Sequence, residues 1–300
     1  MSIAALGGLS AVEVFKRAVK DFSADSMTTY AAALAYRIVF SLFPFLLFLV
    51  ALLAFLQIPD LFAWMREQAS LVVPSDAMGQ VNTVIDELQT PRGGLVSIGI
   101  LLALWSASVG VMSLIEALNV AYDVAERRPT WRLYLLSVVY TVGLAVLLIG
   151  AAVLMVLGPQ AAGWVASQLG MGDAFVAIWT WVRWPIAVVL LMLTVSIVYY
   201  AGPNIRQRFR FITPGAVLAV VIWIAASVAF GLYVRNFANY NATYGSIGAI
   251  VILMFYFYLS AVVLLFGAEV NSVIRNHREG RPDQPLADRR KAKAGSAAAG

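Results

Sequence analysis

Three charged residues lie inside stretches of sequence that are otherwise apolar: Arg37, Glu116 and Glu269. A charge buried alone in hydrocarbon is costly, whereas a guanidinium and a carboxylate that meet there offset much of that cost. We therefore expect Arg37 to meet Glu116, Glu269 or both. Such a cluster could be a structural clasp between helices, or it could hold an anionic substrate.

The residues that follow Arg37 form one polar or small-residue face of a helix. Ser41 and Pro44 lie at helical spacings from Arg37. Pro44 leaves the carbonyl of Phe40 without its helical donor and predicts a bend, and the Ser41 hydroxyl can bond a nearby carbonyl. This face suits a substrate path. The simpler alternative is that the Arg37 side chain extends to the lipid headgroups and only anchors the helix.

Polar residues also accompany the two glutamates. Asn119 follows Glu116 by three residues, and Asn271 follows Glu269 by two. Serines and a glycine on the helical face of Glu116 are typical of close helix packing. We assign Asn119 and Asn271 to the same predicted charge cluster and substrate path.

The residues that enzymes commonly use are scarce. The chain has no cysteine, and its one histidine, His277, lies near the carboxyl end. This composition excludes a cysteine or multi-histidine metal site and a Ser/His/Asp triad. No phosphate-binding GxxxxGK motif is present. We therefore expect no catalytic residue, no metal and no cofactor, and we do not expect an enzyme.

The composition is that of a polytopic membrane protein. Of the 300 residues, 61% are hydrophobic and 12% are charged, whereas charged residues make up about a quarter of soluble domains. The fold class is therefore all-α, with six transmembrane helices in one membrane domain over residues 1–275 and a disordered basic tail over 276–300. The expected spans are about 28–56, 95–122, 133–157, 185–202, 213–233 and 245–271.

Short amphipathic helices are expected at the membrane surface. Residues 10–25 alternate apolar and basic positions with helical period. The polar segment 57–94 contains two more candidates, at 61–70 and 78–88, and residues 160–184 are rich in tryptophan, which favours the headgroup region.

The basic residues give the orientation. With six spans, sixteen lysines and arginines fall on the side of the two termini and four fall on the other side. The positive-inside rule then places both termini in the cytoplasm. It also places Arg37, Glu116 and Glu269 near the cytoplasmic ends of their helices. Because topology already explains the basic residues, we expect the lipid bilayer and not nucleic acid as the partner.

Four segments occur in an order that resembles the YihY/BrkB family of bacterial inner-membrane proteins: AAALAYRIVFSLFP, LWSASVGVMSLIEALNVAYD, YAGPNIRQRFRFITPGA and YGSIGAIVILMFYFYLSAVVLLFGAEVN. The resemblance covers roughly residues 12–275. Its pattern falls on Tyr36, Ser41, Pro44, Trp105, Asn119, Pro203, Pro214, Gly215, Tyr244, Gly245, Glu269 and Asn271.

The resemblance implies a six-helix protein of the inner membrane. The family is associated with virulence, resistance to serum killing and envelope lipid handling, and its older label of ribonuclease is widely regarded as a misassignment. Of these expected residues, Tyr36, Trp105, Pro203, Pro214, Gly215, Tyr244 and Gly245 are interpreted as structural.

Two functions follow as hypotheses. The first is a transporter or flippase-like protein for an amphiphilic envelope compound such as an anionic lipid, in which Arg37 attracts the headgroup and Glu116 and Glu269 hold Arg37 until substrate arrives. Bending at Pro44 and Pro214 would open the path. The second is a non-transporting scaffold for envelope integrity, with its surface on residues 57–94. Ribonuclease activity is the least favoured hypothesis.

Overall fold

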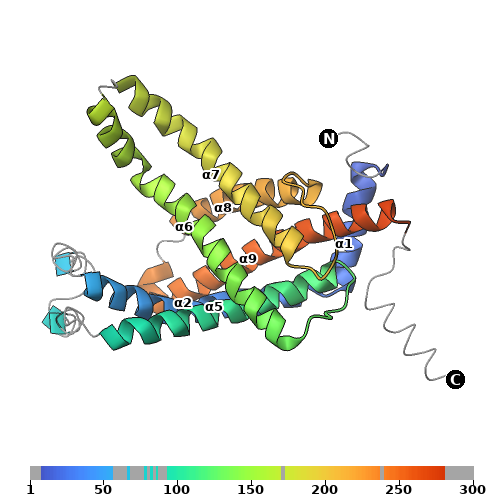
Figure 1. Cartoon of the computed structure of the whole chain (residues 1–300), viewed down its shortest axis with the longest axis horizontal. Helices are drawn as coiled ribbons and strands as arrows, with labels where there is room; N and C mark the ends of the chain where they lie inside the picture. Colours follow the sequence, from blue (N-terminus) through green and yellow to red (C-terminus); the bar gives the residue numbers. More distant parts are fainter. Residues whose placement is uncertain are drawn as a thin grey trace. The chain divides into compact units, whose positions relative to one another are not determined.

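The computed structural model describes residues 8–56, 66–67, 78–79, 82–83, 86, 93–169, 173–236 and 240–280. All regular elements in these ranges are helices, which confirms the all-α class (Figure 1). They are α1 (Ala11–Ala24), α2 (Met27–Leu56), α5 (Gly93–Ala121), α6 (Thr130–Leu169), α7 (Asp173–Ala201), α8 (Pro214–Asn236) and α9 (Tyr240–Arg278). Most of segment 57–94, with its expected surface helices, and residues 281–300 of the tail lie outside the described residues.

Five of the described helices are long and apolar enough to cross a membrane. The candidate spans are Ile98–Ala121, Thr130–Ala151, Phe175–Ala201, Pro214–Val234 and Ile250–Arg278. The helix α2 has 30 residues and contains the remaining expected span. A multi-pass membrane protein is therefore supported, while the sixth span and the orientation stay predictions.

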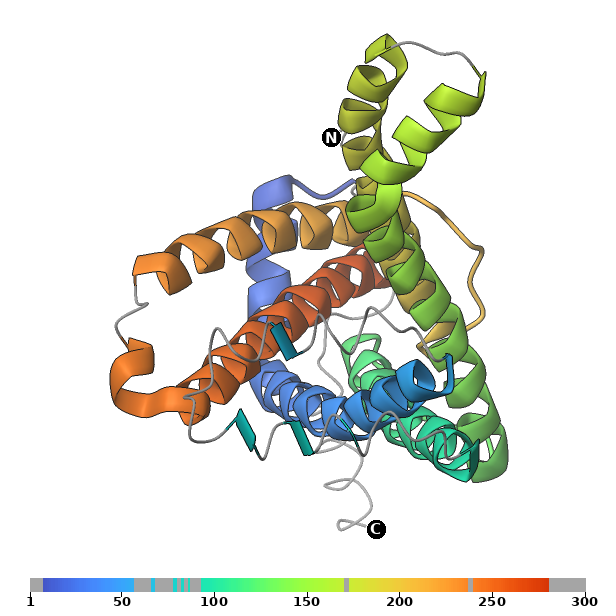
Figure 2. The same ribbon diagram turned by 90° about the vertical axis from the view of Figure 1, so that its left-hand side faces the viewer.

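Three helix boundaries differ from those expected from the sequence. The helix α6 continues through Gly158 and Pro159 to Leu169, and α7 begins at Asp173, so Pro185 lies inside α7. Prolines are tolerated within membrane helices because neighbouring groups satisfy the freed carbonyl. The helix α9 reaches Arg278, into the stretch assigned to the tail. Figures 1 and 2 show α6 and α7 as a helical hairpin, in which the two helices pack against each other.

The chain divides into two compact units. The larger unit comprises the described residues of 1–36 and 111–300, and the smaller unit those of 37–110. The larger unit contains α1, the first turns of α2, the end of α5 and all of α6 to α9. It holds the residues that form the site described below.

The core of the larger unit is built largely from small residues. Alanines of α2, α5, α8 and α9 are buried in one cluster, as Ala31, Ala117, Ala121, Ala216, Ala219, Ala261 and Ala268. Gly267 of α9 is packed so closely that a Cβ there would lie 2.6 Å from the Gly215 carbonyl oxygen and 2.8 Å from the Ala219 Cβ. Small residues let helix backbones approach in this way, as is common in membrane helices.

The amino-terminal helix α1 packs against α9. The Ser10 hydroxyl caps α1 by accepting a hydrogen bond from the backbone nitrogen of Glu13 (3.2 Å). Val14 and Ala18 are buried with residues of α9. Val12 and Val19 stay exposed, so α1 has one face on the protein and a second apolar face, as an interfacial helix requires.

Candidate functional site

The link between α7 and α8 carries arginine at every second residue. Arg206, Arg208 and Arg210 lie in an irregular stretch outside the helices. Between the first two, the Gln207 amide donates to the α7 carbonyl oxygens of Tyr199 (2.7 Å) and Tyr200 (3.2 Å). This amide attaches the middle of the link to the end of α7.

The beginning of the link is held by a network centred on Asn119, at the end of α5. The Asn119 side-chain oxygen accepts a hydrogen bond from the Asn204 backbone nitrogen (2.7 Å), and its amide nitrogen donates to Glu126 (2.8 Å). Glu126 also accepts two hydrogen bonds from the Arg128 guanidinium (2.8 and 2.6 Å). Arg128 in turn donates to the Gly202 carbonyl oxygen (3.1 Å). One buried asparagine thus joins the α5–α6 link to the α7–α8 link.

The ionisation of Glu126 reflects this network. Partial burial alone would raise the pKa of the Glu126 carboxyl, but hydrogen bonds from Arg128 and Asn119 outweigh burial and lower that pKa. Hydrogen bonds from charged donors stabilise the ionised carboxylate. The network is therefore formed by charged Glu126.

The end of the link is held by Asn271 of α9. The Asn271 side-chain oxygen accepts from the Gly215 backbone nitrogen (2.9 Å), and its amide donates to the Thr213 hydroxyl oxygen (3.0 Å). Thr213 accepts from the Ala216 nitrogen (3.2 Å) and caps α8, whose first residue is Pro214. The sequence Thr213-Pro214-Gly215 predicts this cap and this first helical position, and the structure confirms both.

Two further hydrogen bonds from α7 hold the surroundings of the link. The Ser196 hydroxyl donates to the Phe211 carbonyl oxygen (2.6 Å), and the Tyr199 hydroxyl donates to the Leu264 carbonyl oxygen in α9 (2.6 Å). Both side chains are buried. The link is therefore positioned by hydrogen bonds from α5, α7 and α9.

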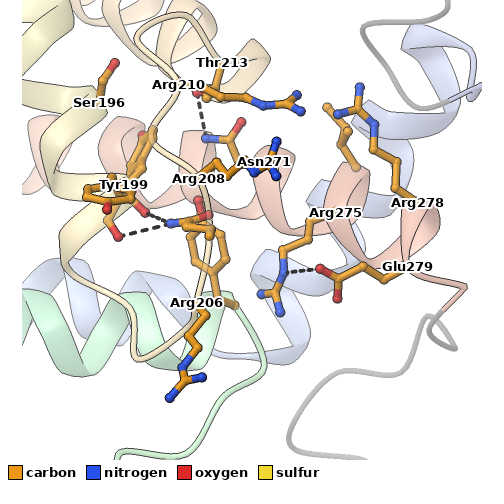
Figure 3. A pocket seen from close by; sticks show the side chains of 14 residues that line it. Ser196, Tyr199, Arg206, Arg208, Arg210, Thr213, Asn271, Arg275, Arg278 and Glu279 are labelled. Atoms are coloured by element: carbon orange, nitrogen blue, oxygen red, sulfur yellow. Dashed lines mark hydrogen bonds and ion pairs between the residues drawn. The ribbon is translucent and has the colours of Figure 1, made fainter.

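These elements line the arginine pocket, an open cavity of about 280 Å³ (Figure 3). Five arginines line it against one acid, Glu279. Arg275 of α9 donates through Nε to Glu279 Oε1 (3.0 Å), while its Nη1 is buried and has no hydrogen-bond acceptor among the described residues. The lining residues are Tyr122, Ser196, Tyr199, Tyr200, Arg206, Gln207, Arg208, Arg210, Thr213, Asn271, Ile274, Arg275, Arg278 and Glu279.

The lining of the arginine pocket has the chemistry that suits an anion. Guanidinium groups offer paired N–H donors that match carboxylate and phosphate oxygens, and they remain charged at any physiological pH. In the part of the chain that the structure describes, no group of three or more His, Cys, Asp or Glu residues could hold a metal ion.

Two apolar crevices adjoin the same segment of α7. One, of about 200 Å³, lies among α5, α6 and α7, and the other, of about 280 Å³, lies among α5 to α9. Ser196 lines the arginine pocket, Ile197 lines the smaller crevice, and Val198 lines both crevices. Charged and apolar cavities therefore surround consecutive residues of one helix.

The structure brings together only part of the cluster expected from the sequence. Asn119 and Asn271 hold the two ends of the arginine-bearing link. Glu269 is 1% exposed in α9, and Glu116 is exposed on α5. No hydrogen bond or ion pair joins either glutamate to another described residue of the larger unit. Arg37 belongs to the smaller unit, so its pairing with them stays a prediction.

Within the smaller unit, Arg37 makes one long hydrogen bond. Its Nη1 lies 3.4 Å from the carbonyl oxygen of Val109. The Ser41 hydroxyl donates to the Ile38 carbonyl oxygen (2.7 Å), and Pro44 lies inside α2, as expected. These contacts secure the helix locally.

The remaining residues of the family pattern occupy varied positions. Pro203 and Gly215 are buried at the two ends of the arginine-bearing link. Tyr36 and Trp105 are each 62% exposed, so their rings are available to lipid. Tyr244 and Gly245 lie in the first turns of α9, and the Tyr244 side chain is outside the described residues.

The sequence interpretation missed the arginine pocket itself. It used Arg206, Arg208, Arg210 and Arg275 only as charges that set the orientation. The signal was present in the run RQRFR, because side chains at every second residue of an extended segment share one side. The sequence could not predict that the end of α9 forms the opposite wall of the pocket.

Comparison with known proteins identifies relatives along most of the chain. The model of the family described as virulence factor BrkB matches residues 18–292. The putative ribonuclease-like protein YfkH of Bacillus subtilis is 38% identical over 85% of this chain and 92% of its own length. UPF0761 membrane proteins of Alkalilimnicola ehrlichii and Paraburkholderia xenovorans are 29% and 25% identical. The matches cover 87% and 88% of this chain, but the chain spans only 58% and 60% of those two relatives. No solved structure matches the chain.

Proposed function

The chain belongs to the BrkB family, and from that premise we propose that it binds an anionic amphiphile, such as a lipid, and moves it across the membrane. The observation that carries this proposal is the placement of one cationic pocket and two apolar crevices around consecutive residues of α7. An amphiphile has the matching parts: a charged headgroup and an apolar chain. The ribonuclease-like name belongs to the relative YfkH.

The charge distribution supports a cytoplasmic position for the arginine pocket. Arg206, Arg208 and Arg210 lie in a link that the positive-inside rule assigns to the cytoplasm. The same rule assigns the last turn of α9, with Arg275 and Arg278, to the cytoplasm. The headgroup would then be collected from, or delivered to, the inner leaflet. The larger apolar crevice follows α7 inward from Val198 to Leu191, where an acyl chain belongs, and the smaller one lies at the last turns of α7.

The polar stripe of α2 completes the proposed path. Arg37 and Ser41 would contact the headgroup farther along its route, and the bend at Pro44 would allow the helix to move. Glu116 and Glu269 would hold Arg37 in the absence of substrate, as the sequence suggests.

Reconstitution into liposomes tests the proposal. Vesicles carrying the protein and a fluorescent anionic phospholipid should show exchange of that lipid between leaflets, measured by quenching from outside. Replacing Arg206 and Arg208 with Gln should slow the exchange, whereas Arg127→Gln, outside the pocket, should not. A non-transporting scaffold predicts no exchange beyond that of empty vesicles, and that result would refute transport.

A further inference from the structure

We infer that the arginine pocket recognises a terminal phosphate, the dianionic phosphomonoester headgroup of an amphiphile. The inference deepens the proposed function and rests on it for the membrane setting of the ligand. It is carried by the number of guanidiniums around the cavity, the donors that have no acceptor, and the size of the space that they enclose.

The charge of the lining calls for a multivalent anion. Five arginines line one cavity, and Glu279 is the one acid among its lining residues. Like charges that are brought together repel unless counter-ions screen them. A carboxylate or phosphodiester brings one negative charge. A phosphomonoester brings nearly two above its second pKa of about 6, so it balances more of this excess.

The charged donors that remain available in the arginine pocket are guanidiniums. The side chains of Arg206, Arg208 and Arg210 make no hydrogen bond or ion pair to the described residues, and Arg275 Nη1 is buried without an acceptor. The neutral donors of Tyr199, Gln207 and Asn271 already donate to protein oxygens. Three terminal oxygens of a phosphomonoester can accept from several guanidiniums at once, which a carboxylate with two oxygens does less well.

The size of the pocket fits a headgroup and not a whole lipid. At about 280 Å³ it lies at the small end of ligand cavities, which are commonly about 300–1,000 Å³. An acyl chain has no place among the arginines, but Val198 and Ile197 line apolar crevices beside the pocket. The space near the arginines therefore accommodates a phosphate with a few further atoms.

The test measures binding to the full-length protein in nanodiscs of phosphatidylcholine. Three probes are compared: phosphatidic acid, which is a phosphomonoester; phosphatidylglycerol, which is a phosphodiester; and soluble glycerol phosphate. Native mass spectrometry counts bound lipid, and competition by glycerol phosphate measures the phosphate alone. We expect phosphatidic acid to bind about tenfold tighter than phosphatidylglycerol at pH 8, with the preference shrinking below a pH of about 6.

Variants assign the binding to the pocket. Arg208→Gln should weaken binding of phosphatidic acid by about ten- to a hundredfold, since hydrogen bonds between charged groups are lost. Arg208→Lys keeps the charge without the paired donors and should fall between Arg208→Gln and wild type. Arg127→Gln is the matched control, because Arg127 is an exposed arginine of a neighbouring link that does not line the pocket. Equal thermal stability of the variants excludes misfolding.

Each outcome decides the inference. Equal affinity for the two lipids at pH 8, or equal losses with Arg208→Gln and Arg127→Gln, would overturn it, even if liposomes still exchange lipid. Competition by glycerol phosphate as strong as binding of phosphatidic acid would support the phosphate site and identify a soluble ligand, which contradicts the amphiphile of the proposed function. Preference for phosphatidic acid without lipid exchange would support the site and refute transport alone.

Discussion

The arginines of the pocket and Arg37 represent two ways of placing a cation in a membrane protein. Arg37 projects from the interior of a long apolar helix, and among the described residues it donates one long hydrogen bond, of 3.4 Å, to a carbonyl oxygen. The pocket arginines come from a link and from the last turns of α9, where hydrogen bonds from three helices fix the backbone around them. A charge inside an apolar span is easy to find in a sequence. A binding site, however, requires several side chains around one cavity and a backbone that holds them in place.

The largest effect on stability is expected from a change in the packing of α8 against α9, the helix that carries Arg275 of the arginine pocket. Replacing Gly267 with Ala should lower the free energy of unfolding by about 1–3 kcal/mol, because the new Cβ would meet the Gly215 carbonyl and the Ala219 side chain. Gly150→Ala is the control, since a Cβ there meets nothing within 4 Å. Thermal unfolding in detergent measures both variants. Equal stabilities would mean that α8 and α9 do not pack this closely.

Acid should weaken the hydrogen-bond network that holds the arginine-bearing link, because Glu126 takes part in it. Burial raises the pKa of Glu126 in the folded protein, but hydrogen bonds from Arg128 and Asn119 lower it by more. Charged Glu126 therefore contributes to the free energy of unfolding above its unfolded pKa of about 4.3, and this contribution disappears as the pH falls through the folded pKa. Glu126→Gln should cost about 1 kcal/mol at neutral pH and progressively less in acid.

The difference between wild type and Glu126→Gln is the quantity to follow. Asp21 of α1 has a raised pKa, first because of burial and second because of Asp123, so acid relieves an unfavourable charge there and acts in the opposite direction. Subtracting the unfolding free energy of Glu126→Gln from that of wild type at each pH removes the contribution of Asp21, which both proteins share. A difference that does not change between pH 7 and pH 3 would show that Glu126 is not tied to Arg128.

Replacing Arg37 with Gln tests the other side of the comparison. Because its single hydrogen bond to Val109 is long, folded yield should be normal and unfolding should change by less than about 0.5 kcal/mol. Binding of phosphatidic acid should be unchanged, while lipid exchange slows if Arg37 lies on the route. Loss of folded protein would instead identify a structural ion pair, since an uncompensated buried charge is strongly destabilising.

The smallest effect is expected at Glu279. This carboxylate accepts a hydrogen bond from the Nε of Arg275 (3.0 Å) at the edge of the arginine pocket, so it competes with an arriving anion for that donor. Because its side chain is 41% exposed, the pair is weak, and Glu279→Gln should tighten phosphate binding only about twofold. Titration of nanodiscs with phosphatidic acid measures the change, and weaker binding would contradict competition.

The sequence predicted the helical membrane architecture because long apolar stretches have few alternatives in lipid. It also predicted the Thr213 cap and the start of α8 at Pro214, since both signals are local. It selected Asn119 and Asn271, although for a different role. It did not predict the pocket, because Arg208 and Arg275 are distant in the chain and only tertiary packing brings them together. The sequence also placed a helix boundary at Pro185, following the rule that proline ends helices in water. That rule applies less strictly within a membrane, so the boundary was wrong.

Asn119 has a consequence that follows from its two hydrogen bonds. Its oxygen accepts from Asn204 while its nitrogen donates to Glu126, so a single amide serves two polypeptide connections simultaneously. Exchanging that amide for a methyl group would remove both of these bonds at once and leave the bond from Arg128 to the Gly202 carbonyl oxygen between the two links, whereas replacing either partner would spare the other bond. Any motion that carries the arginines must keep this fastening or release it in one step.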